Sequence, residues 1–287
     1  MKQVIKEFLR FCKDTFLFLY FLMNIIRQKS FSNPITKKYS GSVAVLANGP
    51  SLKEVIPHLC VGEEFNGTDF IAMNFFAFDG VFFKIKPKHY CLADPMFFKE
   101  NHRINDVRKL FEILQNKVDW ELSVYIPKTN YNQFVNFSGI TNKKIVIIGL
   151  NCVYYTGIES FRYVFYKKGL AMPSAQTVAN MAIYVALNCN YSKIRLYGVD
   201  HTFFDSLYVN EDNQLCMEEK HFYDDNKNNV KPVLRSDNGK CYKISEYCEE
   251  KFNIFYSHDL LEGYAKYLNV NILNCTKNSL IDSYDRK

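Results

Sequence analysis

The sequence has little of what defines several large protein classes. It contains 12 glycines and 8 prolines in 287 residues, which excludes collagen and low-complexity chains. Its nine cysteines, from Cys12 to Cys275, are odd in number and form no CxxC pair. We therefore expect free thiols in a reducing cytosol, not disulfides or a zinc cage. With 48% hydrophobic residues, the chain is long enough for one large or two small domains with a real core.

Signatures of several nucleotide and metal enzymes are also missing. The chain has no GxGxxG dinucleotide fingerprint, no P-loop GxxxxGK[ST], no HExxH metalloprotease motif and no D-x-D triplet. The D-x-D triplet is the usual metal-nucleotide clamp of sugar-nucleotide enzymes. We expect no bound metal and no cofactor.

Excess positive charge is scarce outside the N-terminus. The formal net charge is +6, of which residues 1–29 contribute +4, from six basic and two acidic side chains. The other 258 residues carry 30 basic and 28 acidic side chains. A nucleic-acid-binding domain is normally basic, so we expect no nucleic-acid partner.

The N-terminal 29 residues form an apolar and basic segment. Residues 15–26, TFLFLYFLMNII, are uncharged, but they are too few to span a bilayer, which takes roughly 20. No small-residue cleavage site follows them, which argues against a signal peptide. We predict an amphipathic helix over 1–29 that lies on a membrane surface with its basic side chains facing anionic headgroups. The alternative is a helix packed on its own domain or on a partner subunit of a homo-oligomer. Residues 30–41 read as a linker.

The remainder, 42–287, alternates strand and helix patterns and predicts one α/β domain with a mostly parallel sheet. Residues 201–240 are polar and lack periodicity, which predicts a lid or binding insertion. Apolar runs predict strands at 42–48, 69–74, 86–94, 123–127, 144–149, 193–200 and 270–274. Helical spacing predicts helices after Ser51 and at 104–118, 174–187 and 259–268.

Polar residues follow the predicted strands, where ligands bind in doubly wound sheets. Gly49, in the turn Asn48-Gly49-Pro50-Ser51, would bring backbone amides close to an anion, and Ser51 would cap the next helix. An ordinary strand-helix turn is the alternative. Asn74 and Asp94 could read ribose or sugar hydroxyls, and Asp94 could instead hold a cation. Asp200 ends the strand at 193–200.

Three histidines and one tyrosine are candidates for acid-base chemistry. His201 follows a strand end, His221 lies in the predicted lid, and His258 precedes the helix predicted at 259–268. A helix dipole can keep such a histidine neutral at pH 7, as a general base requires. Tyr208 could donate a hydrogen bond to a leaving phosphate. A structural histidine or a loop aromatic is the ordinary alternative for each.

Several motifs together resemble glycosyltransferase family 42, the bacterial sialyltransferases that move a nonulosonic acid from a CMP donor to a galactoside. These are VAVLANGPSLKE, the MN of DFIAMNFF, PSAQTV before a long helix, IRLYGVD and the closing NSLI, in order over about 42–282. The resemblance implies a single Rossmann-like (GT-A-type) sheet with a lid, an inverting reaction, no metal and a histidine base.

The resemblance also assigns roles to particular residues of this chain. It implies that Tyr208 steadies the leaving phosphate and that His258 is the general base, with His221 in reserve. The family's other tyrosine is Thr202 here, for which His201 or Tyr223 would substitute, and its asparagine after the third strand is Asp94. The donor would be held by Asn48, Gly49, Ser51, Asn74, Ser174, Asp200, Asn278 and Ser279.

ANGPSL, the strand-end Asp-Pro and LYGVD also resemble the 6-hydroxymethylpterin diphosphokinase-like family. In such an enzyme Asp94 and Asp200 would bind Mg²⁺ and ATP. A basic aromatic anchor suits a transferase that acts on lipid-linked glycans better than a pterin enzyme. We therefore expect a glycosyltransferase with a CMP-type donor and a glycan or glycolipid acceptor, peripheral on the cytoplasmic face of the inner membrane. A non-catalytic sugar-nucleotide-binding subunit is the remaining alternative.

Overall fold

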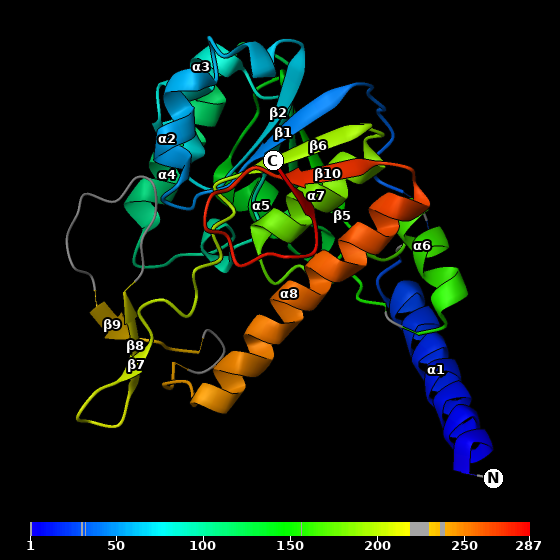
Figure 1. Cartoon of the computed structure of the whole chain (residues 1–287). Coiled ribbons are helices and arrows are strands. Elements are labelled where there is room, and N and C mark those ends of the chain that lie inside the picture. The colour runs from blue at the N-terminus through cyan, green and yellow to red at the C-terminus, as the bar shows by residue number, and fades with distance from the viewer. Residues whose placement is uncertain (1, 30, 32, 156, 219–229, 236–238) are drawn as a thin grey trace.

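The computed structural model describes residues 2–29, 31, 33–155, 157–218, 230–235 and 239–287. Its centre is an eight-stranded parallel sheet in the order β11-β10-β6-β1-β2-β3-β4-β5 (Figure 1). The strands are β1 (Ser42–Leu46), β2 (Thr68–Met73), β3 (His89–Cys91), β4 (Leu122–Pro127), β5 (Ile145–Leu150), β6 (Lys193–Tyr197), β10 (Asn271–Asn274) and β11 (Asp285–Arg286). The prediction of an α/β fold with a mostly parallel sheet is confirmed, and each of the seven predicted strands has a counterpart.

Helices cover both faces of this sheet because its central strands are apolar on both sides. In β1, Val43 and Val45 join one core with residues of α1, α6, α7 and α8, while Ala44 and Leu46 join the other with α2, α3, α4 and α5. All four strand residues are fully buried, as expected for a covered parallel sheet. The helices are α1 (Lys2–Arg27), α2 (Leu52–Val55), α3 (Val81–Ile85), α4 (Ile104–Lys117), α5 (Tyr131–Ser138), α6 (Glu159–Lys167), α7 (Val178–Asn188) and α8 (Ile244–Tyr267).

The strand order reverses beside β1, which gives the sheet a topological switch point. From β1 the chain moves outward through β2, β3, β4 and β5, and then returns to place β6 on the other side of β1. The two strands pair in parallel from Ser42↔Lys193 to Leu46↔Tyr197. The crevice beyond their carboxyl ends is the usual ligand site of a doubly wound sheet.

Residues 201–240 contain secondary structure that their sequence did not predict. A small antiparallel sheet forms from β7 (Tyr208–Val209), β8 (Leu215–Glu218) and β9 (Val230–Pro232). It projects from the lower left of the molecule in Figure 1. Strands of two to four residues are too short to show alternation, which explains the missed assignment.

Helix α8 begins 15 residues before the predicted helix start at 259. Glu246 stabilises its beginning, because its carboxylate accepts a hydrogen bond from the Lys243 amide at 3.0 Å. The first half of α8 has no single apolar stripe, since Phe252 is 62% exposed while Tyr247 and Ile254 are buried. Helical periodicity therefore fails as a signal there. As a consequence His258 lies inside the helix and not at its positive end.

The N-terminal residues form helix α1, and part of it packs on the body. Phe21 and Ile25 are buried, and the Phe21 ring lies 4.6 Å from that of Tyr155 and 4.9 Å from that of Phe165 on α6. The region predicted to be a linker also contacts the body, where Ile35 is buried and the Tyr39 amide donates to the Cys189 carbonyl at 2.8 Å. Within the described chain, no helix combines the length and apolarity that a membrane crossing requires.

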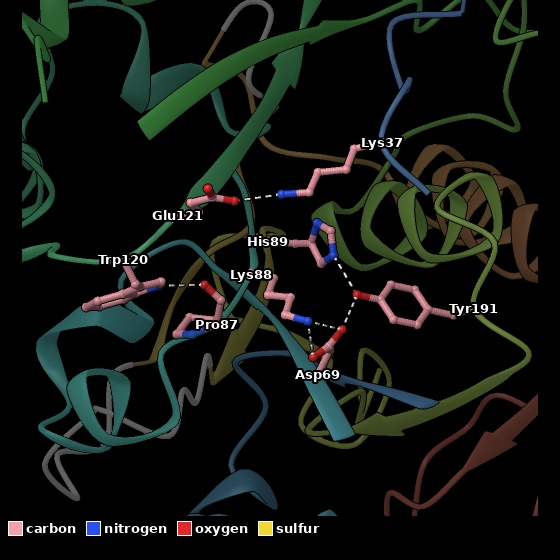
Figure 2. Close-up of polar contacts among 8 residues, drawn as sticks. All are labelled: Lys37, Asp69, Pro87, Lys88, His89, Trp120, Glu121 and Tyr191. Carbon is pink, nitrogen blue, oxygen red and sulfur yellow. Dashed lines mark hydrogen bonds and ion pairs between the residues drawn. The ribbon is translucent and has the colours of Figure 1, made fainter. Parts of the chain in front are cut away.

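A partly buried polar cluster lies at the amino ends of the strands (Figure 2). The Tyr191 hydroxyl donates to Asp69 at 2.7 Å and lies 2.9 Å from Nε2 of His89, while Lys88 pairs with Asp69 at 2.8 Å. His89 is fully buried, and this burial lowers its pKa to about 4. Each member has partners here, so the cluster joins β2, β3 and the start of β6 at the edge opposite the switch point.

All nine cysteines are free thiols, as predicted.

Candidate functional site

A cavity of about 480 Å³ lies at the switch point, beyond the carboxyl ends of β1 and β6. Its wall comes from the turn after β1, the end of β2, the first turn of α7, the segment after β6, and β8. This volume is in the range of pockets that hold small molecules. The strand-end location that the sequence pointed to is therefore hollow and lined by residues from five segments.

The turn Asn48-Gly49-Pro50-Ser51 is held by the segment that follows β6. The Gly49 amide donates to the Gly198 carbonyl at 2.8 Å. Asp200 accepts two hydrogen bonds from Ser51, from its hydroxyl at 2.9 Å and from its amide at 3.2 Å. A Cβ on Gly49 would lie 1.8 Å from an Asp200 carboxylate oxygen, so only glycine fits. The expected helix cap is wrong, because the Ser51 side chain makes no capping bond to α2 and binds Asp200 instead.

These contacts give Asp200 and Gly49 a structural role in the cavity wall. Asp200 is buried, which raises the pKa of its carboxyl, although the two hydrogen bonds from Ser51 oppose this shift. The Asp200 carboxylate binds Ser51, and the Gly49 amide donates to Gly198, so Gly49 does not offer the free amide for an anion that the sequence suggested. Both instead fix the shape of the cavity wall.

Two asparagine side chains in the cavity wall, and a third in the first turn of α7, have buried polar atoms without partners among the described residues. Neither the amide oxygen nor the amide nitrogen of Asn48 forms a hydrogen bond with any residue that the structure describes, although Asn48 is only 9% exposed. Oδ1 of Asn74 and Nδ2 of Asn180 are also buried and have no hydrogen-bond partner among the described residues. Asn48 and Asn74 line the cavity, and Asn180 lies in the first turn of α7. An unpaired buried amide atom costs about 1–3 kcal/mol, and a ligand would remove that cost.

The 11-residue helix α7 begins at the cavity. Thr177 caps it by accepting a hydrogen bond from the Asn180 amide at 3.3 Å, and Val178 and Ala179 form part of the cavity wall. The first amides of a helix have no partner within the helix and carry partial positive charge. An anionic group at this end of the cavity would be stabilised.

Two of the predicted histidines lie together. His201 lines the cavity, and its Nε2 is 3.0 Å from Nε2 of His258, whose Nδ1 is 2.9 Å from the Tyr284 hydroxyl. His258 is fully buried behind His201 and has both ring nitrogens occupied. Burial lowers the pKa of His201 to about 3, helped by Lys251, and the pKa of His258 well below its usual value. Both are therefore neutral at pH 7, through burial and not through a helix dipole.

The other sequence-predicted site residues do not line the cavity. Asp94 is exposed and accepts a hydrogen bond from the Met96 amide at 2.9 Å, which caps a short 3-10 helix. Tyr208 is 48% exposed on β7. Ser279 is buried and donates a hydrogen bond to the Val199 carbonyl at 2.7 Å, so it stabilises the segment that follows β6. Ser174 and Asn278 lie in loops outside the cavity wall, and His221 lies outside the described residues.

The cavity also contains residues that sequence reasoning missed. Thr177, Asp205 and Met217 line it, the last from β8. Thr177 had a detectable signal, because a threonine before an apolar helix is a typical N-cap. Asp205 and Met217 had none, since they come from the aperiodic segment that folds over the cavity.

No protein-family model matches the chain, and no curated protein shows significant similarity to it. Among the described residues, no group of three histidine, cysteine, aspartate or glutamate side chains could hold a metal ion.

Proposed function

We propose that this protein is an inverting glycosyltransferase that works without a metal ion, takes a sugar from a CMP-type nucleotide donor and transfers it to a glycan or glycolipid acceptor. The cavity at the switch point would hold the donor. The segment after β6 together with β8 would act as the lid that the sequence suggested.

The unpartnered amide of Asn48 is the observation that carries this proposal. Its donor and its acceptor are both buried in the cavity wall, so a ligand that both gives and accepts hydrogen bonds suits it. The pyrimidine base and the hydroxyls of a CMP-sugar supply such groups. The α7 N-terminus in the same cavity suits the phosphate. Neutral amides and a helix end thus match the two chemical parts of a nucleotide sugar.

Transfer in this cavity needs one group that takes a proton and one that stabilises the leaving phosphate. Asp205 lines the cavity with an exposed carboxylate that has no partner among the described residues, and we assign it as the base. The acceptor oxygen would attack the anomeric carbon while its proton passes to Asp205. The bond from that carbon to the phosphate breaks, and its electron pair stays on the phosphate oxygen, near His201. This replaces the expected base His258, whose ring nitrogens are both bonded.

An asparagine pair tests the proposal. Asn48→Ala removes an unpaired amide, so its free energy of unfolding should stay unchanged or rise by about 1 kcal/mol, while the affinity for CMP falls at least about tenfold. Asn188 is the matched control, because its buried amide bonds to Tyr184 at 3.2 Å and to Tyr264 at 3.4 Å, away from the cavity. Asn188→Ala should lose about 1–3 kcal/mol of stability and keep its CMP affinity. Equal CMP affinity in Asn48→Ala and the unmodified protein would contradict the proposal.

Metal dependence separates the proposal from its alternatives. Thermal shifts with CMP, UDP, GDP and ATP identify the nucleotide, and a shift by CMP supports the proposal. Transfer from a CMP-sugar should persist in EDTA, whereas a diphosphokinase would need Mg²⁺ and would shift with ATP. CMP binding without turnover would instead indicate a non-catalytic binding subunit.

We further propose that α1 holds the enzyme on the cytoplasmic face of the inner membrane as a peripheral protein. The helix uses Phe18, Phe21, Leu22 and Ile25 against the body, yet it exposes a second set of large apolar side chains. That set is Val4, Ile5, Phe8, Leu9, Phe11, Phe16, Leu19, Tyr20, Met23 and Ile26, each more than half exposed. Lys6, Arg10 and Lys13 accompany them and suit anionic headgroups. In Figure 1 the free end of α1 projects from the body.

Vesicle sedimentation tests this anchoring. The double variant Phe8→Glu/Phe16→Glu removes two exposed rings, each worth about 1.5 kcal/mol or more when buried, so binding to anionic vesicles should fall at least about a hundredfold. Val61→Glu is the control, because Val61 is 77% exposed but lies on the body. Undiminished sedimentation of the double variant would refute the anchor, and self-association through α1 would be seen by analytical ultracentrifugation without lipid.

A further inference from the structure

Three side chains from distant parts of the chain form one hydrogen-bonded series that ends at the cavity. Tyr284 lies before β11, His258 on α8 and His201 after β6. The Tyr284 hydroxyl is 2.9 Å from Nδ1 of His258, and Nε2 of His258 is 3.0 Å from Nε2 of His201. His201 also lines the cavity. The series therefore connects a buried hydroxyl to the wall of the proposed donor site.

The hydrogens of this series can be counted. Tyr284 has one hydroxyl hydrogen, is 4% exposed, and has His258 as its hydrogen-bond partner among the described residues. The hydroxyl therefore donates to Nδ1 of His258, because otherwise its hydrogen would be buried without an acceptor. A neutral imidazole carries one hydrogen, so His258 carries it on Nε2 and donates to Nε2 of His201. His201 must then carry its own hydrogen on Nδ1.

The count depends on both imidazoles being neutral, and their surroundings ensure this. Burial lowers the pKa of each ring far below neutrality, and Lys251 disfavours a positive charge on His201 further. The His201 ring is also flanked by Phe203, at a centroid distance of 4.9 Å, and by Phe255 at 6.1 Å. These rings hold the imidazole in place with Nε2 toward His258. Its Nδ1 has no hydrogen-bond partner among the described residues, and His201 itself lines the cavity.

We propose that Tyr284 and His258 are positioning residues that fix His201 as the tautomer with its hydrogen on Nδ1, so that His201 presents a hydrogen-bond donor to a ligand oxygen in the cavity. The reverse arrangement, with Nδ1 as an acceptor, would leave the Tyr284 hydrogen unpaired and is disfavoured by about tenfold or more. The identity of that oxygen as a phosphate oxygen rests on the proposed function, whereas the tautomer itself does not. His201 then stabilises negative charge in the cavity and accepts no proton.

Nuclear magnetic resonance on the unliganded full chain tests the tautomer directly, since the chemical shifts of isotope-labelled ring nitrogens distinguish protonated from unprotonated atoms. The expected result is two adjacent histidines of opposite type, His258 protonated on Nε2 and His201 on Nδ1. The His201 signals are assigned by their loss in His201→Asn, and the neighbouring His258 signals by their shift in the same variant. Protonation of His201 on Nε2 would overturn the proposal without any variant.

Two sets of variants test the roles that follow. Tyr284→Phe removes the hydrogen that fixes the series, so a second tautomer of His201 should appear, and an unchanged spectrum would overturn the positioning role of Tyr284. His201 has φ +53°, a backbone conformation that asparagine and glycine tolerate. His201→Asn keeps an amide donor near the position of Nδ1 and should retain CMP affinity within a few-fold, whereas His201→Gly should lose about tenfold. Equal affinities would overturn the donor role, and absence of CMP binding to the unmodified protein would overturn the phosphate assignment while leaving the tautomer result intact.

Discussion

Replacement of Gly49 by alanine should damage the protein at one identifiable contact. The new Cβ would lie 1.8 Å from a carboxylate oxygen of Asp200 and 2.5 Å from the Gly198 carbonyl oxygen, where real Cβ contacts essentially never fall under 3.0 Å. Asp200 would have to move by about 1 Å or more, which breaks its two hydrogen bonds with Ser51. The Gly198 backbone would have to move as well, and it cannot rotate away as a side chain can.

The size of the effect follows from these contacts. Overpacking typically costs 1–3 kcal/mol, and hydrogen bonds to a charged group are worth about 1.5–3 kcal/mol each, part of which a shifted carboxylate can keep. We expect Gly49→Ala to lower the free energy of unfolding by about 2–4 kcal/mol. The measurement is urea unfolding, monitored through the fluorescence of Trp120, the single tryptophan of the chain. The Trp120 indole donates a hydrogen bond to the Pro87 carbonyl at 2.8 Å (Figure 2).

Two further variants test whether Gly49 packs closely against Asp200. Gly80→Ala introduces a Cβ with no atom within 4 Å and should change stability by less than about 1 kcal/mol. Adding Asp200→Ala to Gly49→Ala should recover only part of the loss, because the contact with the Gly198 carbonyl remains. If Gly49→Ala were as stable as Gly80→Ala, the close packing of Gly49 against Asp200 would be refuted. Additivity of the two substitutions at positions 49 and 200 would also argue against their contact.

The polar cluster at the opposite edge of the sheet gives two further predictions. His89 has a pKa of about 4 in the folded protein against about 6.5 when unfolded, so the unfolded state binds more protons between these values. Its contribution to stability, up to about 3 kcal/mol, should be complete above about pH 6.5 and lost as the pH falls toward 4, and unfolding curves of His89→Gln should depend less on pH in this window. Tyr191→Phe removes the hydroxyl that bonds to Asp69 and His89, and should cost about 1–3 kcal/mol in urea unfolding. CMP affinity should not change in Tyr191→Phe, and a loss of CMP affinity would contradict the separation of the two edges.

Much of the fold was predictable because it depends on local patterns. Val43–Leu46 is an apolar run that can only be buried, and the helical spacing of 104–118 identifies α4. The parts that were missed have no such pattern. Strands of two to four residues in 208–232 are too short to alternate, and the first half of α8 buries residues on more than one side.

The candidate site divides in the same way. Asn48 and Asn74 were predictable because they follow strands, and the strand ends of a parallel sheet share one edge. Gly49, Ser51 and Asp200 lie at the predicted edge of the sheet, but they contact one another. These contacts, such as the hydrogen bond between Ser51 and Asp200, join positions 149 residues apart in the sequence. His201 and His258 are 57 residues apart in sequence, and nothing local shows that one covers the other.

The sequence by itself therefore determined the class of fold, the edge of the sheet at which the cavity lies, and the apolar and basic character of the N-terminal segment. These properties follow from periodicity, composition and the geometry of parallel strands, all of which are local or general. The tertiary structure alone decided which polar groups remain available at that edge. It pairs Asp200 with Ser51, encloses His258 behind His201, and leaves Asn48 without a hydrogen-bond partner in the described part of the chain. Availability is set by which distant side chains meet in the folded chain, and for this reason it cannot be read along the sequence.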